Sequence, residues 1–315
     1  MVPPADNFRF LSSDATGLCI VLWCTILMLG FSNFSVAQDA AFPSLRDPGR
    51  QANHGGLTGT LFRWASEPSA ESAVGPDLNE PLVTDRPDFT EASSTVGQGV
   101  AQLEFGYTFT FDSEAGTRTR SHSVPEILFR YGIIDDWMEL RFGGNYAYQS
   151  VSGLTAAGAE DLYLGAKLAL TPQAGFLPEM AIIPQMTVPT GHSTLTAGEV
   201  LPGVNWIYGW EINDILSTAG STQFNRAMDD TGSAYTEWAQ SWTVGYSMTD
   251  RVGAYTEWFG FFPHSSEAAK PEHYFNGGLT FLLTDDIQWD VRAGVGLNDA
   301  ADDSFVGTGL SIRFR

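Results

Sequence analysis

Residues 84–112 read TDRPDFTEASSTVGQGVAQLEFGYTFTFD, and the two halves of this stretch differ in pattern. The first half is polar and rich in turn-forming residues. In the second half, apolar residues occupy every second position from Ala101 to Phe111, and polar residues or glycine fill the positions between them. A period of two predicts a β-strand with one apolar face and one wet face.

The same alternation recurs along the rest of the chain. We predict strands at 100–112, 123–133, 137–149, 161–171, 180–190, 203–212, 215–225, 235–248, 251–261, 273–283, 287–296 and 304–314. The connections alternate between short ones at 134–136, 172–178, 213–214, 249–250 and 284–286 and long ones at 113–122, 150–160, 191–202, 226–234, 262–272 and 297–303. Short turns at one end and long loops at the other are typical of outer-membrane barrels. The sequence therefore predicts an all-β fold, a transmembrane antiparallel β-barrel of about 12 strands over residues 83–315.

The two faces of the predicted strands indicate which one meets lipid. Six tryptophans share a phase with the aliphatic residues: Trp206, Trp210, Trp238, Trp242, Trp258 and Trp289. Burying about a dozen ionisable groups of the other phase in a dry core would cost far more than letting them line water. We therefore expect the apolar face outside, in contrast to a secreted β-sandwich. The candidate pore-lining residues are Glu104, Glu126, Arg130, Glu139, Arg141, Asp161, Lys167, Glu211, Glu237, Glu257, Asp290 and Arg292.

The N-terminal part of the chain predicts export. Residues 17–31 form an apolar run of signal-peptide length, and a small-x-small cleavage site ends at Ala37. We predict a signal peptide over 1–37 and a flexible periplasmic lead-in over 38–82, which is rich in Pro, Gly, Ser and Ala. The alternatives are an uncleaved anchor and a misassigned start codon. Cys19 and Cys24 are the only cysteines, so the predicted mature chain has none.

Several matching stretches point to one family. The sequence TDRPDFTEASSTV (84–96), followed by QLEFGYTFT (102–110), resembles the family named for the meta-pathway of phenol degradation. Further matching stretches are 124–143, 159–170, 255–263 and 290–314, so the resemblance covers roughly residues 83–314. Members of the family are predicted outer-membrane barrels often described as transporters. The resemblance implies a link to aromatic catabolism, such as substrate uptake.

Charged residues before the first strand allow two interpretations. Asp85, Arg86, Asp88 and Glu91 could fold up into the lumen as a small plug, with Arg86 paired to a lumen carboxylate such as Glu104. They could instead form a local turn below the barrel, in which the aspartates accept hydrogen bonds from nearby backbone N–H groups. We favour the local turn.

Candidate residues for catalysis or metal binding lie in the predicted loops. The histidines are His122, His192, His264 and His273, with Ser193 beside one of them, and residues 298–303 contain Asp299, Asp302 and Asp303. A hydrolase needs a serine, a histidine and an acid in converging geometry, which adjacency in sequence does not supply. The calcium-like loop lacks the spacing of a dedicated site. We therefore predict no enzyme activity, no metal and no cofactor.

The expected function follows from the barrel. We predict a channel or facilitator in the outer membrane of a diderm bacterium for small molecules, including aromatic or hydrophobic ones. The alternatives are a structural or interaction barrel without transport and an outer-membrane hydrolase. Expected partners are outer-membrane lipids, an unidentified small-molecule substrate, and the barrel assembly machinery through the last strand, which ends at Phe314. The net charge of −21 argues against nucleic acid.

Overall fold

The computed structural model describes residues 59–62 and 76–315, apart from 115, 230 and 267. The predicted signal peptide and most of the lead-in lie outside these residues. The described strands are β1 Ala101–Glu114, β2 Thr117–Gly132, β3 Met138–Val151, β4 Leu154–Ala159, β5 Leu162–Thr171, β6 Glu179–Val188, β7 Leu201–Glu211, β8 Leu216–Met228, β9 Ala234–Thr249, β10 Val252–His264, β11 Glu272–Thr284, β12 Ile287–Gly296 and β13 Ser304–Phe314. Among the described residues, no helix is long and apolar enough to cross a membrane.

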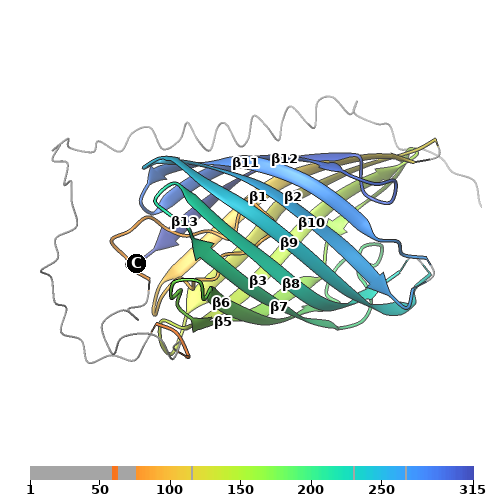
Figure 1. Cartoon of the computed structure of the whole chain (residues 1–315). Helices are drawn as coiled ribbons and strands as arrows, with labels where there is room; N and C mark the ends of the chain where they lie inside the picture. Colours follow the sequence, from red (N-terminus) through yellow and green to blue (C-terminus); the bar gives the residue numbers. More distant parts are fainter. Residues whose placement is uncertain (1–58, 63–75, 115, 230, 267) are drawn as a thin grey trace, which may run out of the picture. The chain divides into compact units, whose positions relative to one another are not determined.

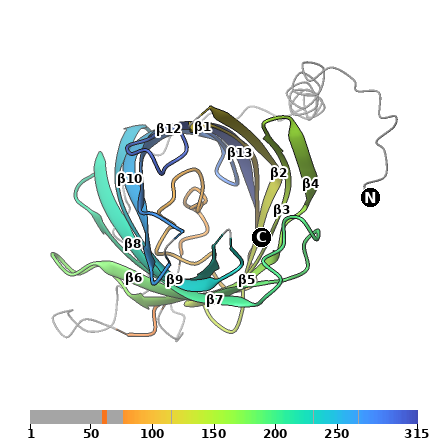
Figure 2. The same ribbon diagram turned by 90° about the vertical axis from the view of Figure 1, so that its right-hand side faces the viewer.

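The strands form one antiparallel sheet that closes on itself (Figures 1 and 2). β1 pairs with both β2 and β13, in a register that runs from Ala101 opposite Phe314 to Phe111 opposite Ser304. One half of β3 pairs with β4 and the other half with β5, so these two short strands share one position in the wall. The barrel therefore has twelve strand positions, which confirms the predicted fold.

Some predicted loops are strands, which corrects the sequence-based boundaries. The range 113–122 belongs mostly to β1 and β2, and 150–160 contains β4 after a turn at Ser152 and Gly153. Both turn residues have positive φ values, 48° and 92°. The end of the first hairpin is polar on both faces, and that of the second consists mostly of small residues, so the hydrogen-bond ladder continues where the apolar alternation has stopped. The pattern predicts only the part of a strand that has an apolar side.

The barrel has a polar interior and an apolar outer wall. In β1, Gln102 and Glu104 are fully buried inside, whereas Leu103 and Phe105 lie on the outer face. Outward-facing aromatic side chains elsewhere remain substantially exposed, as for Trp206 at 45%. The alternation of β-strand side chains thus separates a lipid-facing surface from a charged lumen.

The lumen is occupied by the chain that precedes β1. Residues 81–99, here called the inner segment, run within the ring of strands (orange in Figure 2). Near its start, the Leu82 N–H donates to the carbonyl of Asp285, and at its end the Gly99 N–H donates to the carbonyl of Gly132. Both contacts lie at the short-turn, periplasmic end of the barrel. The inner segment therefore enters and leaves on the same side.

Candidate functional site

Asp85 anchors the inner segment to the barrel wall through three cations. Its carboxylate lies 2.5 Å from Arg141 Nη1, 2.8 Å from Lys167 Nζ and 3.4 Å from Arg130 Nε. All four side chains are buried, with Asp85 only 3% exposed. The three cations come from β3, β5 and β2, so one carboxylate joins the inner segment to three strands. We call Asp85 and these three residues the Asp85 cluster.

Three further carboxylates complete the neutralisation of these cations. Glu139 accepts hydrogen bonds from Arg130 Nε and Nη2 at 2.8 and 3.0 Å. Glu104 accepts from Arg130 Nη1 at 3.1 Å, and Glu91 accepts from Arg141 Nη2 at 2.6 Å. Charges buried this far from water persist only when paired and hydrogen-bonded. The inner segment supplies two of the acids, Asp85 and Glu91, that the cluster uses.

Lumen side chains also satisfy the backbone of the inner segment. Glu104 accepts from the N–H groups of Asp85 and Arg86 at 3.1 to 3.2 Å, and Glu139 accepts from that of Val96 at 2.9 Å. Buried backbone groups need such partners because no strand ladder serves them here. The carboxylates of the wall therefore hold both the charges and the backbone of the inner segment.

Arg86 forms a second attachment, to β2 and β12 of the barrel wall. Its Nη1 lies 2.9 Å from Glu126, and its Nε lies 3.5 Å from Asp290. A Cβ atom at either Gly106 or Gly309 would overlap the guanidinium, so glycine in these strands leaves room for the side chain. Arg292 adds a hydrogen bond of 2.9 Å to the carbonyl of Pro87.

The bend of the inner segment is held by Glu257. Its carboxylate accepts from the N–H groups of Phe89 and Thr90 at 2.8 and 2.7 Å, and from the Thr90 hydroxyl at 2.8 Å. The Thr90 hydroxyl also lies 2.6 Å from the Ser241 hydroxyl, while Asp88 interacts with Glu257 and with the Thr243 side chain. The favoured expectation of a local turn is therefore wrong, because these contacts join the segment to distant strands.

Three of the candidate pore-lining residues lie away from the inner segment. Asp161, between β4 and β5, accepts from the N–H groups of Gly191 and Ala197 at 3.0 and 2.9 Å and so holds an extracellular loop. Glu237 accepts from the Tyr235 hydroxyl at 2.9 Å, and Glu211 is exposed at the periplasmic end of β7. The other nine occur in the contacts described above.

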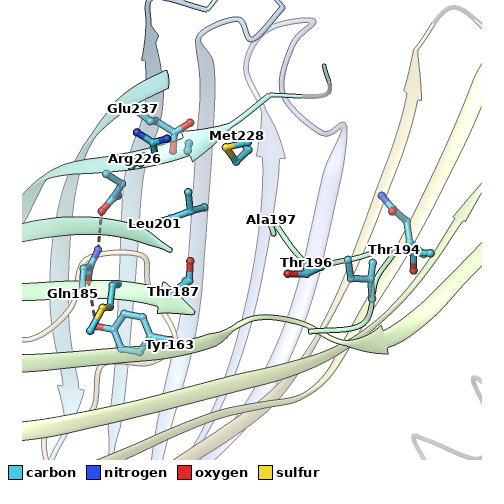
Figure 3. Close-up of a pocket in the computed structure, with 15 residues that line it drawn as sticks. Tyr163, Gln185, Thr187, Thr194, Thr196, Ala197, Leu201, Arg226, Met228 and Glu237 are labelled. Carbon is cyan, nitrogen blue, oxygen red and sulfur yellow. Dashed lines mark hydrogen bonds between the residues drawn. The ribbon is translucent and has the colours of Figure 1, made fainter. Parts of the chain in front are cut away.

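A cavity of about 580 Å³ opens in the extracellular half of the barrel (Figure 3). Its wall includes Tyr163, Gln185 and Asn225, with the loop residues 194–197 on another side. The Tyr163 hydroxyl donates to Gln185 at 3.2 Å, and the Gln185 amide donates to Asn225 at 2.9 Å. The lining mixes hydroxyl, amide and aliphatic groups with two charged side chains, Arg226 and Glu237.

An aromatic cluster lies at the bend of the inner segment. Phe89 meets Phe259 and Phe261 from β10, with Tyr274 from β11 and Phe305 from β13 beside them. Phe259 and Phe261 share the phase of the candidate pore-lining residue Glu257 on the same strand. Tyr274 and Phe305 share the lumen phase of Asn276 and Ser311, which is a usable signal. Phe89 lies outside any periodic stretch, so no pattern identifies it.

The loop histidines and aspartates have separate surroundings. His122 contacts Tyr107, His192 contacts Thr194, and the His273 ring stacks on Trp258. Within the described ranges, no group of three His, Cys, Asp or Glu side chains is arranged to hold a metal ion. Burial raises the pKa of Asp302 to about 6, with the nearby acids Asp112, Glu272 and Asp303 adding to the effect.

Comparisons with known proteins place the chain in a family. No curated protein matches it. It is similar to the COG4313 outer membrane channel from Pseudomonas putida F1, at 13% identity and a TM-score of 0.57 over 76% of this chain and all (100%) of that one. It also matches the CymD monoaromatic hydrocarbon channel, at 12% identity and a TM-score of 0.41 over 69% of this chain and 88% of that one. The model of the family described as "Putative MetA-pathway of phenol degradation" matches residues 84–314, and the chain therefore belongs to that family.

Proposed function

We propose that the protein is an outer-membrane channel for small aromatic molecules and that the inner segment closes it at rest. The observation that carries this proposal is the joint presence, inside one closed barrel, of an extracellular cavity of about 580 Å³ and an aromatic cluster. Ligand sites of this kind combine apolar rings with a few placed polar groups. The inner segment lies across the path from this half of the lumen to the periplasm.

The comparisons with known proteins agree with this proposal, which rests on the geometry of the lumen. The family is described by a phenol degradation pathway, and the similar Pseudomonas putida protein is described as an outer membrane channel. Similar solved structures include channels and porins, so we propose no catalytic role. The rival function is that of a barrel that never opens. The Asp85 cluster favours this rival, because three buried ion pairs hold the inner segment to the wall.

The proposal predicts uptake that depends on movement of the inner segment. Thr90 and Ser241 have hydroxyl oxygens 2.6 Å apart, so cysteines at both positions are placed to form a disulfide that ties the bend to β9. Cells producing the oxidised Thr90→Cys/Ser241→Cys variant should take up labelled phenol no faster than cells without the protein. A reductant should restore the wild-type rate.

Single-cysteine variants are the controls for the disulfide, because they contain the substitutions but cannot form the cross-link. The single variants Thr90→Cys and Ser241→Cys should each show the same uptake under oxidising and reducing conditions. Uptake must be measured in cells at low substrate concentration, because aromatic molecules also cross phospholipid bilayers unaided. Equal uptake by wild-type, locked and protein-free cells would exclude a channel function and favour the permanently closed barrel.

We further propose that the chain reaches the outer membrane after cleavage of its signal segment. The mature protein is expected to begin at Gln38 and to be found in the outer-membrane fraction, since residues 35–37 have the small-x-small form of a cleavage site. N-terminal sequencing or peptide mass analysis checks this. Recovery of an intact 17–31 segment from the membrane-bound protein would show an anchor instead.

A further inference from the structure

The ring of Phe89 occupies a position built from the aromatic side chains of the wall. It stacks on Phe259 with ring centroids 4.7 Å apart and planes 7° from parallel. Phe261 meets it edge-on at 5.4 Å and 88°. Tyr274 stacks on Phe259 at 4.8 Å, and Phe305 lies beside both. Stacked and edge-on contacts on one ring form the geometry in which proteins hold an aromatic ligand.

Phe89 differs from the other rings because it belongs to the inner segment and covers them. Phe259 and Tyr274 are only 8% and 6% exposed with Phe89 in place, whereas Phe89 itself is half-buried. Its side chain comes from a stretch with no strand pairing, so it is held by the stack and by the bonds to Glu257. The wall site is therefore preformed by β10, β11 and β13, and its occupant is separable from it.

We propose that this wall site, formed by Phe259, Phe261, Tyr274 and Phe305, binds a single-ring aromatic substrate, and that Phe89 is its internal occupant. An incoming ring takes the place of Phe89 and releases the bend of the inner segment from β10. Substrate binding and opening are then one event, because the closed state and the bound state compete for the same stack. The inference rests on the proposed channel function and names its binding site.

The surrounding charges select the kind of aromatic ligand. Glu257 accepts four donors here: the Phe89 and Thr90 N–H groups, the Thr90 hydroxyl and the Asn276 amide. Three of these donors leave when Phe89 and Thr90 move, and only the Asn276 amide stays, so Glu257 can accept from a substrate hydroxyl. A carboxylate on the ring would instead meet the Glu257 carboxylate, which stays in the wall beside Asn276 when the segment moves. Arg292 lies over the Phe305 ring, 5.6 Å from its centroid, but donates to the Pro87 carbonyl and the Thr108 hydroxyl, so Glu257 is the nearest charge without a counter-ion among the described residues. The site therefore suits neutral phenols better than benzoates.

The test is a binding measurement that needs no transport. Phe89→Ala removes the internal occupant, and an apolar site emptied in this way takes up a benzene-sized molecule. In detergent solution, ¹⁹F NMR titration should show 4-fluorophenol binding at least about tenfold more tightly to Phe89→Ala than to wild type, since the competing ring is gone. 4-Fluorobenzoate should show no such gain.

Two variants act as controls in the same titration. Phe275→Ala makes the same truncation on the outer wall, where Phe275 is 47% exposed, and should bind as wild type does. The double variant Phe89→Ala/Phe259→Ala lacks the stacking partner and should lose the gain. A gain that persists in the double variant, or no gain in Phe89→Ala, would overturn the assignment.

A second measurement covers the case in which Phe89→Ala does not fold. In the Ser241→Cys chain, which has Phe89 intact, phenol should speed labelling of the thiol because Thr90 leaves it, and benzoate should not. Unchanged labelling at saturating phenol would also overturn the proposal. Binding without channel activity would leave this inference standing and remove only the proposed transport function.

Discussion

Replacing Asp85 with alanine should release the inner segment while the barrel stays folded. The change leaves Arg130, Arg141 and Lys167 short of a counter-charge in the closed state, whereas these cations regain water once the segment has left. Removing one partner of a buried ion pair costs about 3–5 kcal/mol. Because each 1.4 kcal/mol is a factor of ten, we expect the open population to rise by roughly a hundredfold or more.

Single-channel recording in planar bilayers measures this change directly. Asp85→Ala should show frequent or persistent open levels, whereas the wild type should be mostly closed. Labelling provides a second reading, since a cysteine at position 241 is covered by Thr90 in the closed state and fully buried. Gel mobility before and after boiling reports whether the barrel is folded, because a closed ladder resists detergent.

Two further variants test whether the effect of Asp85→Ala is specific to the inner segment. Arg86→Glu should have the same direction of effect, because it sets a new acid against Glu126 and Asp290. Asp214→Ala removes an exposed acid from a periplasmic turn and should leave conductance unchanged. If the Asp85→Ala barrel folds but stays closed, and a cysteine at position 241 stays protected from labelling, the inner segment is a permanent plug of the lumen.

The wall of the barrel could be predicted because its physical cause repeats along the chain. Lipid outside and water inside impose a period of two, so the ranges 287–296 and 304–314 were predicted with the bounds that β12 and β13 have. This alternation is lost where both faces of a strand are in contact with water. The split between β4 and β5, and the tall hairpin that joins β1 to β2, lie in such regions.

The sequence could not decide between a lumen plug and a local turn for the inner segment, because the contacts of this segment are not local. Asp85 reaches Lys167, which is 82 residues away, and Arg292 reaches Pro87, which is 205 residues away. The sequence identified most of the charged side chains of the lumen. A lumen plug of residues 85–91 was one of two interpretations, but nothing in the pattern favoured it over a local turn or marked Asp85 as the residue around which the cations gather. Only the closed barrel brings β2, β3, β5, β10 and β12 around one segment.

The second large effect concerns the outer wall. Leu279 lies near the middle of β11, faces outward and is 37% exposed, so lipid is its expected neighbour. An arginine on the lipid face costs about 2–4 kcal/mol near the midplane, which is a loss of roughly 30-fold or more in the folding equilibrium. We expect Leu279→Arg to leave little folded, heat-modifiable barrel in the outer membrane.

The adjacent residue supplies the matched control for this prediction. Thr280 faces the lumen and pairs with Asp290 on β12, whose carboxylate lies 3.5 Å from Arg86 Nε. An arginine at position 280 gains that acid and competes with Arg86 for it, so Thr280→Arg should fold normally and loosen the inner segment. The two variants add the same charge one residue apart. If both assemble equally well, or if Thr280→Arg alone fails, the faces of β11 have been assigned to the wrong sides.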